Sequence, residues 1–329
     1  MARLLTRFER MDRLQNRHAA VKHPFELLPW RYNGEMAENE KATGPLGWLR
    51  TAKDKLHSFA FGEESEPDRR PRVGLALAGG FARGIAHIGV LRVLSEAGIP
   101  IDCVAGTSVG ALIGAGYCAG ASLEEMQQIG SLTTFADFGR WTPSWLGLAT
   151  NQRMEKYLAR FSPAKTFEEL KTPFSVATTD INAGVSVYYS HGPLAPVIRA
   201  SCAYPGLFVP IQYDGRTLVD GFLTAPVPIE GALLLGADLV IAVYLEAGNV
   251  EQPRTFTDVL SRAFNILQRH SDLAWRTQAD IIIEPDVKQF VWDDFTKTPE
   301  MVAAGEAAAL AALPQIRAAL RGEKRDSAA

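Results

Sequence analysis

Val104-Ala105-Gly106-Thr107-Ser108-Val109-Gly110 decides the fold, because it places a serine in a G-x-S-x-G pentapeptide between an apolar run and a helical run of small residues. Such a pentapeptide is typical of a nucleophile elbow, in which the serine occupies a sharp turn from a strand to a helix. A side chain at Gly106 or Gly110 would collide with the strand or the helix. The turn also puts Ser108 at a helix N-terminus, which favours developing negative charge. The stretch predicts a catalytic serine, although glycine-rich turns also occur as plain packing solutions.

A second glycine-rich turn lies upstream. The run Val73–Ala78 reads as a buried strand, and the loop Gly79–Gly84 connects it to a helical pattern. The N–H groups of such a loop can hold a phosphate or an oxyanion. A dinucleotide fingerprint ending at Gly84 would need glycine at Phe81, and the lysine of a P-loop is missing. The loop therefore favours an oxyanion hole, with an arginine that braces the loop rather than one that is simply solvated. The predicted oxyanion-hole residues are Gly79, Gly80, Phe81 and Arg83.

The third motif is Leu218-Val219-Asp220-Gly221, which by itself is most often a turn. In this order, the three motifs resemble the patatin-like phospholipase family, whose members carry a glycine-rich loop ending Arg-Gly, a G-x-S-x-G serine and a D-G-G or D-G-A aspartate. The runs Arg83–Leu91 and Ala200–Pro210 resemble the bacterial branch of that family. The resemblance implies a Ser108–Asp220 catalytic pair in a patatin-like domain at residues 71–325. The motif glycines are Gly84, Gly106, Gly110 and Gly221.

Two phenylalanines depart from the family pattern. Phe81 and Phe222 stand where relatives usually have glycine or alanine. If the loop required a positive φ at position 81, phenylalanine would be strained there, so either Phe81 has an ordinary φ or its ring lines an acyl pocket. Phe222 is expected to narrow the site. Three further side chains are expected either to line an acyl channel or to pack on the sheet: Tyr204, Leu207 and Phe208.

The chemistry implied is a two-step acyl transfer on a lipid ester, phospholipid or lysophospholipid by resemblance, with no metal and no organic cofactor. Ser108 attacks the ester carbonyl, and Asp220 accepts the serine proton. A Ser-His-Asp esterase is one alternative, and it needs a histidine after the acid. His270 alone follows Asp220, and it lies in a helical pattern rather than on a loop. His87 is more often a core or capping histidine than a base.

Two other interpretations stay open. Asp180 lies in a Gly/Asn-rich turn, where an Asx-type turn is a more frequent role than catalysis. A non-catalytic lipid-binding or regulatory module on the same fold is the alternative from another class, because Phe81 and Phe222 are features that a degenerate site carries. All catalytic positions are present, which favours an enzyme.

Composition limits the remaining classes. The 329 residues are 47% hydrophobic and 22% charged with a net charge of -3, which gives no reason to expect nucleic acid as a partner. No apolar run reaches the roughly 18 residues of a membrane span, so the chain is expected to be cytoplasmic, soluble or peripherally attached. A homo-oligomer is compatible with this composition. Three cysteines without C-x-x-C spacing read as reduced core residues: Cys103, Cys118 and Cys202.

Apolar strand-like runs alternate with helical patterns from residue 72 onward, which predicts an α/β fold of three layers, α/β/α, with a mostly parallel central sheet. The predicted strands are 73–78, 101–106, 174–179, 185–190, 217–220, 239–244 and 280–284. The predicted helices lie near 84–97, 109–119, 151–160, 255–276 and 300–321. The turn at 178–184 joins two strands as a hairpin.

Residues 1–70 differ from the rest and read as an N-terminal extension that ends in a linker. Residues 1–32 contain seven basic and three acidic residues, which gives this segment a net charge of +4 in a chain whose total is -3. A helix there would carry one apolar stripe beside arginines, so this segment is expected to contact an anionic membrane surface, or alternatively to pack on the catalytic domain or another subunit. The stripe consists of Leu4, Leu5, Phe8, Met11 and Leu14.

Overall fold

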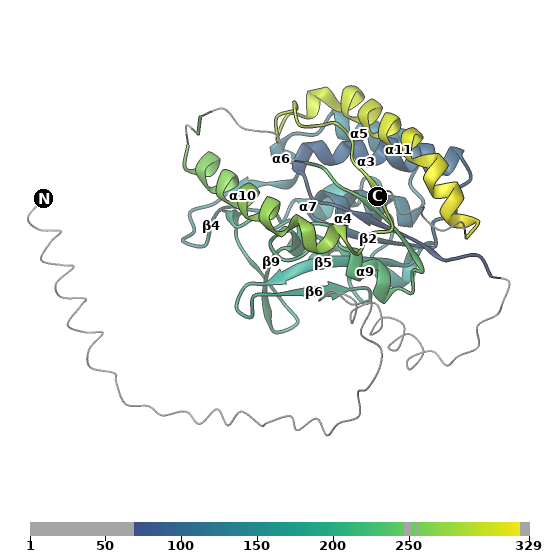
Figure 1. Cartoon of the computed structure of the whole chain (residues 1–329). Coiled ribbons are helices and arrows are strands. Elements are labelled where there is room, and N and C mark those ends of the chain that lie inside the picture. The colour runs from purple at the N-terminus through teal and green to yellow at the C-terminus, as the bar shows by residue number, and fades with distance from the viewer. Residues whose placement is uncertain (1–68, 247–251, 254, 323–329) are drawn as a thin grey trace, which may run out of the picture. The chain divides into compact units, whose positions relative to one another are not determined.

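The computed structural model describes residues 69–246, 252–253 and 255–322 (Figure 1). The predicted basic segment at residues 1–32 and most of the predicted extension lie outside these residues. Among the described helices, none combines the length and the apolar composition that crossing a membrane requires.

A sheet of eight strands forms the middle layer, in the order β11-β10-β1-β2-β5-β9-β8, with β6 beside β5. The pairs along β11-β10-β1-β2-β5 are parallel, whereas β6 and β9 run antiparallel to β5 and β8 runs antiparallel to β9. The strands are β1 (Val73–Leu77), β2 (Cys103–Thr107), β5 (Phe174–Asp180), β6 (Val185–Tyr189), β8 (Ile211–Tyr213), β9 (Arg216–Asp220), β10 (Leu239–Val243) and β11 (Ile281–Ile283).

Helices cover both faces of this sheet, as alternation along β1 shows. Val73, Leu75 and Leu77 belong to the larger core, which packs against α3, α4, α5, α8 and α11, whereas Ala76 and Ala78 face the smaller core, which α9 and the C-terminal end of α10 cover. The fold is therefore the predicted three-layer α/β/α arrangement (Figure 1). The helices are α3 (Ala86–Glu96), α4 (Val109–Ala119), α5 (Leu123–Ser131), α6 (Phe135–Phe138), α7 (Met154–Leu158), α8 (Leu194–Ser201), α9 (Ile229–Leu234), α10 (Phe256–Arg276) and α11 (Thr298–Leu320).

Every predicted strand is present, with its ends within two residues of the expected positions, and the hairpin between β5 and β6 is confirmed. The sequence missed α5, α6, α8 and α9, and also β8. It further missed a second sheet in the order β3-β4-β7, formed by β3 (Arg140–Trp141), β4 (Gly147–Thr150) and β7 (Gly206–Phe208). The three cysteines are free and buried, as expected.

Candidate active site

The serine lies on a strained turn between β2 and α4. Ser108 is the N-cap residue of α4 and has φ 55° and ψ -123°, a conformation that non-glycine residues rarely adopt. A Cβ on Gly110 would approach the carbonyl oxygen of Leu77 to 2.2 Å, and one on Gly106 would approach the Cα of Ala111 to 2.5 Å. The elbow therefore needs glycine on both sides of the serine. Two other motif glycines are equally close to neighbours, Gly84 to a side chain of α4 and Gly221 to the backbone of β5.

β5 brings the serine and the aspartate together. Its first half pairs with β2, and its second half pairs with β9. The C-terminal ends of β2 and β9 therefore lie beside neighbouring residues of β5, Ala177 and Thr178. Ser108 Oγ donates a hydrogen bond to Asp220 Oδ2 at 2.7 Å. Asp220 Oδ1 accepts a second bond from the N–H of Phe222 at 3.0 Å. The carboxylate is thus oriented toward the serine by its own chain turn.

Burial sets the acidity of Asp220. The residue is 1% exposed, and this desolvation raises the pKa of its carboxyl to about 7, against the lowering effect of the bonds from Ser108 and Phe222. A carboxyl with that pKa exchanges its proton near neutral pH, which suits a general base.

Ser201, for which the sequence alone indicates no role, holds the backbone of the elbow. Its Oγ accepts the N–H of Ser108 at 2.8 Å and donates to the carbonyl of Ala177 at 2.7 Å. The Ser108 N–H therefore already has an acceptor. Ser201 is fully buried at the C-terminal end of α8, and it fixes the backbone position of Ser108.

The glycine-rich loop runs from β1 into a short 3₁₀ turn, Phe81–Ile85. The N–H of Gly79 donates to the carbonyl of Pro226 at 3.3 Å, and the N–H of Ala82 donates to the carbonyl of Trp292 at 2.9 Å. Between these two anchors, the N–H groups of Gly80 and Phe81 have no acceptor in the described part of the chain. The loop therefore presents two adjacent N–H donors, at Gly80 and Phe81, whereas the N–H of Gly79, another predicted oxyanion-hole residue, already has an acceptor.

Phe81 has the left-handed conformation that the sequence left undecided, with φ 52°. Its ring packs edge-on against Tyr204 and Trp292, with centroid distances of 5.2 and 4.8 Å. These contacts hold a residue that would otherwise favour negative φ. The expected bond from Arg83 is present, because its Nε donates to the carbonyl of Gly80 at 3.4 Å. Burial lowers the pKa of Arg83.

His87 and Asp180 have structural roles. His87 is fully buried, its Nε2 lies 2.9 Å from the carbonyl oxygen of Ala78, and burial lowers its pKa to about 4, so it is a neutral core histidine. Asp180 Oδ1 accepts the N–H groups of Asn182 and Ala183 at 3.0 and 3.2 Å, which is the expected Asx-type turn. His270 falls within α10, as predicted, and its side chain lies outside the described part of the structure.

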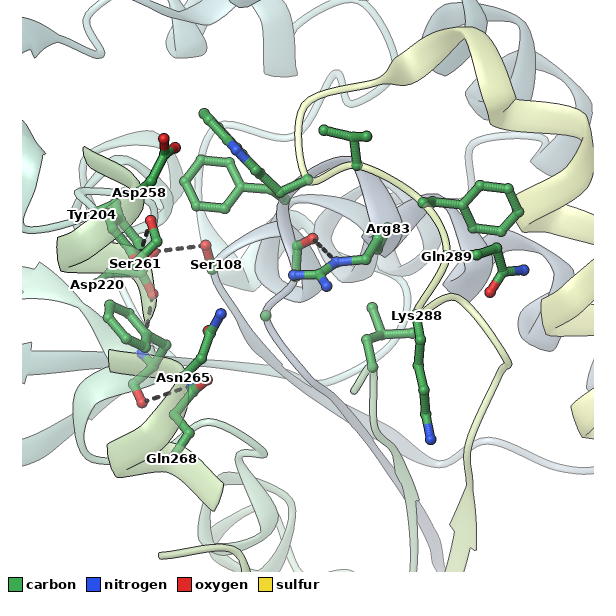
Figure 2. A pocket seen from close by; sticks show the side chains of 18 of the residues that line it. Arg83, Ser108, Tyr204, Asp220, Asp258, Ser261, Asn265, Gln268, Lys288 and Gln289 are labelled. Atoms are coloured by element: carbon green, nitrogen blue, oxygen red, sulfur yellow. Dashed lines mark hydrogen bonds between the residues drawn. The ribbon is translucent and has the colours of Figure 1, made fainter. Parts of the chain in front are cut away.

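A cavity of about 530 Å³ opens at Ser108 and Asp220. Figure 2 shows polar side chains of α10 on one side, with Arg83, Lys288 and Gln289 on the other. Phe222 lines it, and its ring is stacked on that of Tyr204 with a centroid distance of 4.8 Å. No group of three or more His, Cys, Asp or Glu side chains within the described ranges could hold a metal ion. The α10 side chains are Asp258, Ser261, Asn265 and Gln268.

Part of the chain is similar in sequence to known proteins. The family model described as Patatin-like phospholipase matches residues 75–233. An NTE family protein of Mycobacterium tuberculosis is 40% identical over 200 residues, which make up 58% of this chain and 55% of that protein. Lysophospholipase nte1 of Emericella nidulans is 33% identical over 205 residues, 60% of this chain and 13% of that protein.

The aligned region is therefore about half of the mycobacterial relative and a small part of the fungal one. Among solved structures, VipD from Legionella pneumophila gives a TM-score of 0.45 at 16% identity, with 75% of this chain and 67% of that chain covered.

Proposed function

We propose that this protein is a serine hydrolase of lipid esters, acting on phospholipid or lysophospholipid, with Ser108 as nucleophile and Asp220 as general base. The observation that carries the proposal is the 2.7 Å hydrogen bond from Ser108 Oγ to the buried carboxylate of Asp220 at the end of an open cavity. The patatin-like family model and the lysophospholipase relatives support lipid ester hydrolysis.

In the first half-reaction, Ser108 Oγ bonds to the ester carbonyl carbon while its proton moves to Asp220 Oδ2. The carbonyl oxygen becomes an oxyanion, which the N–H groups of Gly80 and Phe81 stabilise. Loss of one such donor raises the barrier by about 3 kcal/mol in other serine hydrolases. When the C–O bond to the leaving alcohol breaks, the proton on Asp220 passes to the alcohol oxygen, and the acyl group stays on Ser108.

In the second half-reaction, water attacks the acyl-enzyme. Asp220 takes a proton from the water as its oxygen bonds to the acyl carbon. When the Ser108–acyl bond breaks, this proton returns to Ser108 Oγ, and a fatty acid leaves. The carboxylate alternates between base and acid, which requires a pKa near the working pH, and burial provides that pKa.

Labelling by a fluorophosphonate probe tests the nucleophile. We expect the probe to modify Ser108, as mapped by mass spectrometry, and Ser108→Ala to remove both labelling and ester hydrolysis. Ser261→Ala is the matched control, because Ser261 lines the same cavity but lies on α10. Labelling at another residue, or hydrolysis by a folded Ser108→Ala variant, would overturn the acyl-enzyme mechanism.

The base is tested separately with His270→Ala. The dyad predicts that this variant keeps its turnover. Loss of turnover in a folded His270→Ala protein would replace the dyad with a Ser-His-Asp triad. If the probe does not label Ser108 in the wild type, the result favours a non-catalytic module.

A further inference from the structure

A second cavity begins at Ser108, and Phe81 lines both this cavity and the larger one. Its volume is about 70 Å³, and nearly all of its wall is hydrocarbon. The larger cavity carries charged and amide groups, so the two spaces that meet at the serine have opposite chemical character. Phe81, held in its left-handed conformation by Tyr204 and Trp292, is the residue that they share besides Ser108.

The smaller cavity extends along α4. Val109, Leu112 and Ile113 line it, and these positions share one face of the helix. Gly116 continues that face, and a Cβ placed there would meet Phe161 at 2.8 Å and the Cε of Met126 at 3.0 Å. Phe161 and Met126 therefore lie beside the third turn of α4, about 12 Å along the helix axis from Ser108. They form the far end of the cavity.

Besides Ser108 and the thiol of Cys202, the polar side chains of this cavity are two hydroxyls whose protons are already used in hydrogen bonds. Thr133 Oγ1 donates to the carbonyl of Ile129 at 2.7 Å, so the 2.7 Å contact between Thr133 Oγ1 and Tyr157 Oη uses the tyrosine proton. Neither hydroxyl keeps a proton to donate to a ligand. An alcohol, a phosphate or a choline head group would lose its hydration here without replacement, whereas a hydrocarbon chain would not.

We propose that the smaller cavity binds the acyl chain of the substrate and that the larger cavity holds the leaving alcohol with its head group. This assignment rests on the proposed function. A water-sized group needs about 10–15 Å³ of such space, so the cavity admits about five to seven such groups. If each group is one carbon beyond the ester carbonyl, the cavity holds an acyl chain of about six to eight carbons. Met126, a flexible side chain at the far end, limits the length.

The test compares kcat/KM for p-nitrophenyl acetate, octanoate and palmitate. We expect the wild type to prefer octanoate and Met126→Ala to raise the palmitate-to-octanoate ratio by about tenfold, since a change of one or a few methylenes in a pocket alters kcat/KM by about that factor or more. Met301→Ala is the matched control, because Met301 is an equally buried methionine that lines neither cavity, and it should leave the ratio unchanged.

Ile113→Phe tests the middle of the cavity. Because the larger side chain fills the space beside α4, octanoate hydrolysis should fall by about tenfold more than acetate hydrolysis. The acetate rate also shows that the variant is folded and that its serine is active.

The outcomes separate the two proposals. If the palmitate-to-octanoate ratio of Met126→Ala matches that of Met301→Ala, or if Ile113→Phe lowers all three rates equally, the acyl-chain assignment is wrong while the hydrolase stands. If the wild type hydrolyses none of the esters and takes no fluorophosphonate label, the proposed function fails, and the acyl-chain assignment fails with it.

Discussion

Replacing Asp220 with asparagine should abolish efficient turnover and also make the protein more stable at neutral and alkaline pH. Asparagine keeps the shape of the side chain, accepts the N–H of Phe222 through Oδ1 and contacts Ser108 through Nδ2. It removes the proton acceptor, so we expect kcat to fall by about 10²-fold or more. It also removes the burial of a negative charge, which opposes folding.

The magnitude of the stability change follows from the pKa of Asp220. The pKa is raised from 3.8 to about 7 by burial. Between these pH values, the folded chain holds a proton at Asp220 that the unfolded chain has lost, so the free energy of unfolding decreases as pH rises, by about 1.4 kcal/mol per pH unit. The decrease in the free energy of unfolding begins near pH 4 and levels off above pH 7. The full difference is on the order of 4 kcal/mol.

Urea unfolding of wild type and Asp220→Asn between pH 4 and 8.5 measures this effect. The free energy of unfolding of Asp220→Asn should exceed that of the wild type only slightly at pH 4. The difference should grow with pH and reach a plateau above pH 7. Over the same range, wild-type kcat/KM should rise as Asp220 ionises, with an apparent pKa near 7. One group thus makes activity and stability change in opposite directions with pH.

Asp180→Asn is the control, since it removes another carboxylate at the end of β5. Burial raises the pKa of Asp180, but bonds from the N–H of Ala183 and from Arg216 outweigh burial and hold the pKa below its ordinary value. Its stabilising contribution is present above the unfolded pKa and is lost as pH falls, so Asp180→Asn should destabilise the protein at neutral pH. If Asp220→Asn were less stable than wild type at pH 8, or if its effect did not vary with pH, the argument from burial would be refuted.

Three other predictions concern the elbow, the loop and the extension. Ser201→Ala leaves the N–H of Ser108 without its acceptor, so the free energy of unfolding should fall by about 1–3 kcal/mol, and kcat should fall while KM stays near wild type. Phe81→Gly should relieve the positive φ, yet by joining the two cavities it should flatten the dependence of kcat/KM on acyl length; an unchanged length profile would contradict this. The full chain should float with anionic vesicles at low salt and be released at high salt, whereas a variant beginning near Arg72 should not bind; equal binding by both would exclude residues 1–32 as the anchor.

The sequence predicted the central strands because they are buried on both faces and therefore read as continuous apolar runs. It missed elements whose formation depends on distant contacts. β4 pairs with β7, far away along the chain, and each is too short to show a pattern. α5 is an exception, because its N-terminus has a local signal: Ser122 caps the helix by accepting the N–H of Glu125 at 3.0 Å. α8 begins after Pro193 and contains Pro196, which obscures a helical pattern.

The candidate site divides in the same way. Ser108 and Asp220 lie in short motifs with a local backbone requirement, so their positions could be read from the sequence. The role of Ser201 could not, because it depends on a hydroxyl reaching an N–H 93 residues away in the chain. The conformation of Phe81 was also undecidable from sequence, since its φ is fixed by rings from two other segments, at Tyr204 and Trp292.

Energetically unfavourable features, two strained backbone conformations and a buried charge, lie close to the point where the two cavities meet. Ser108 and Phe81 both have positive φ, each at a cost of about 1–3 kcal/mol, and Asp220 carries its charge in a buried position. Such terms persist only where the surrounding structure over-determines them. Here the elbow is held by β2 and α4, and the aspartate by β9, each paired or packed with β5. A rigid sheet thus keeps a serine, a carboxylate and two N–H donors in an arrangement that the isolated segments would not adopt.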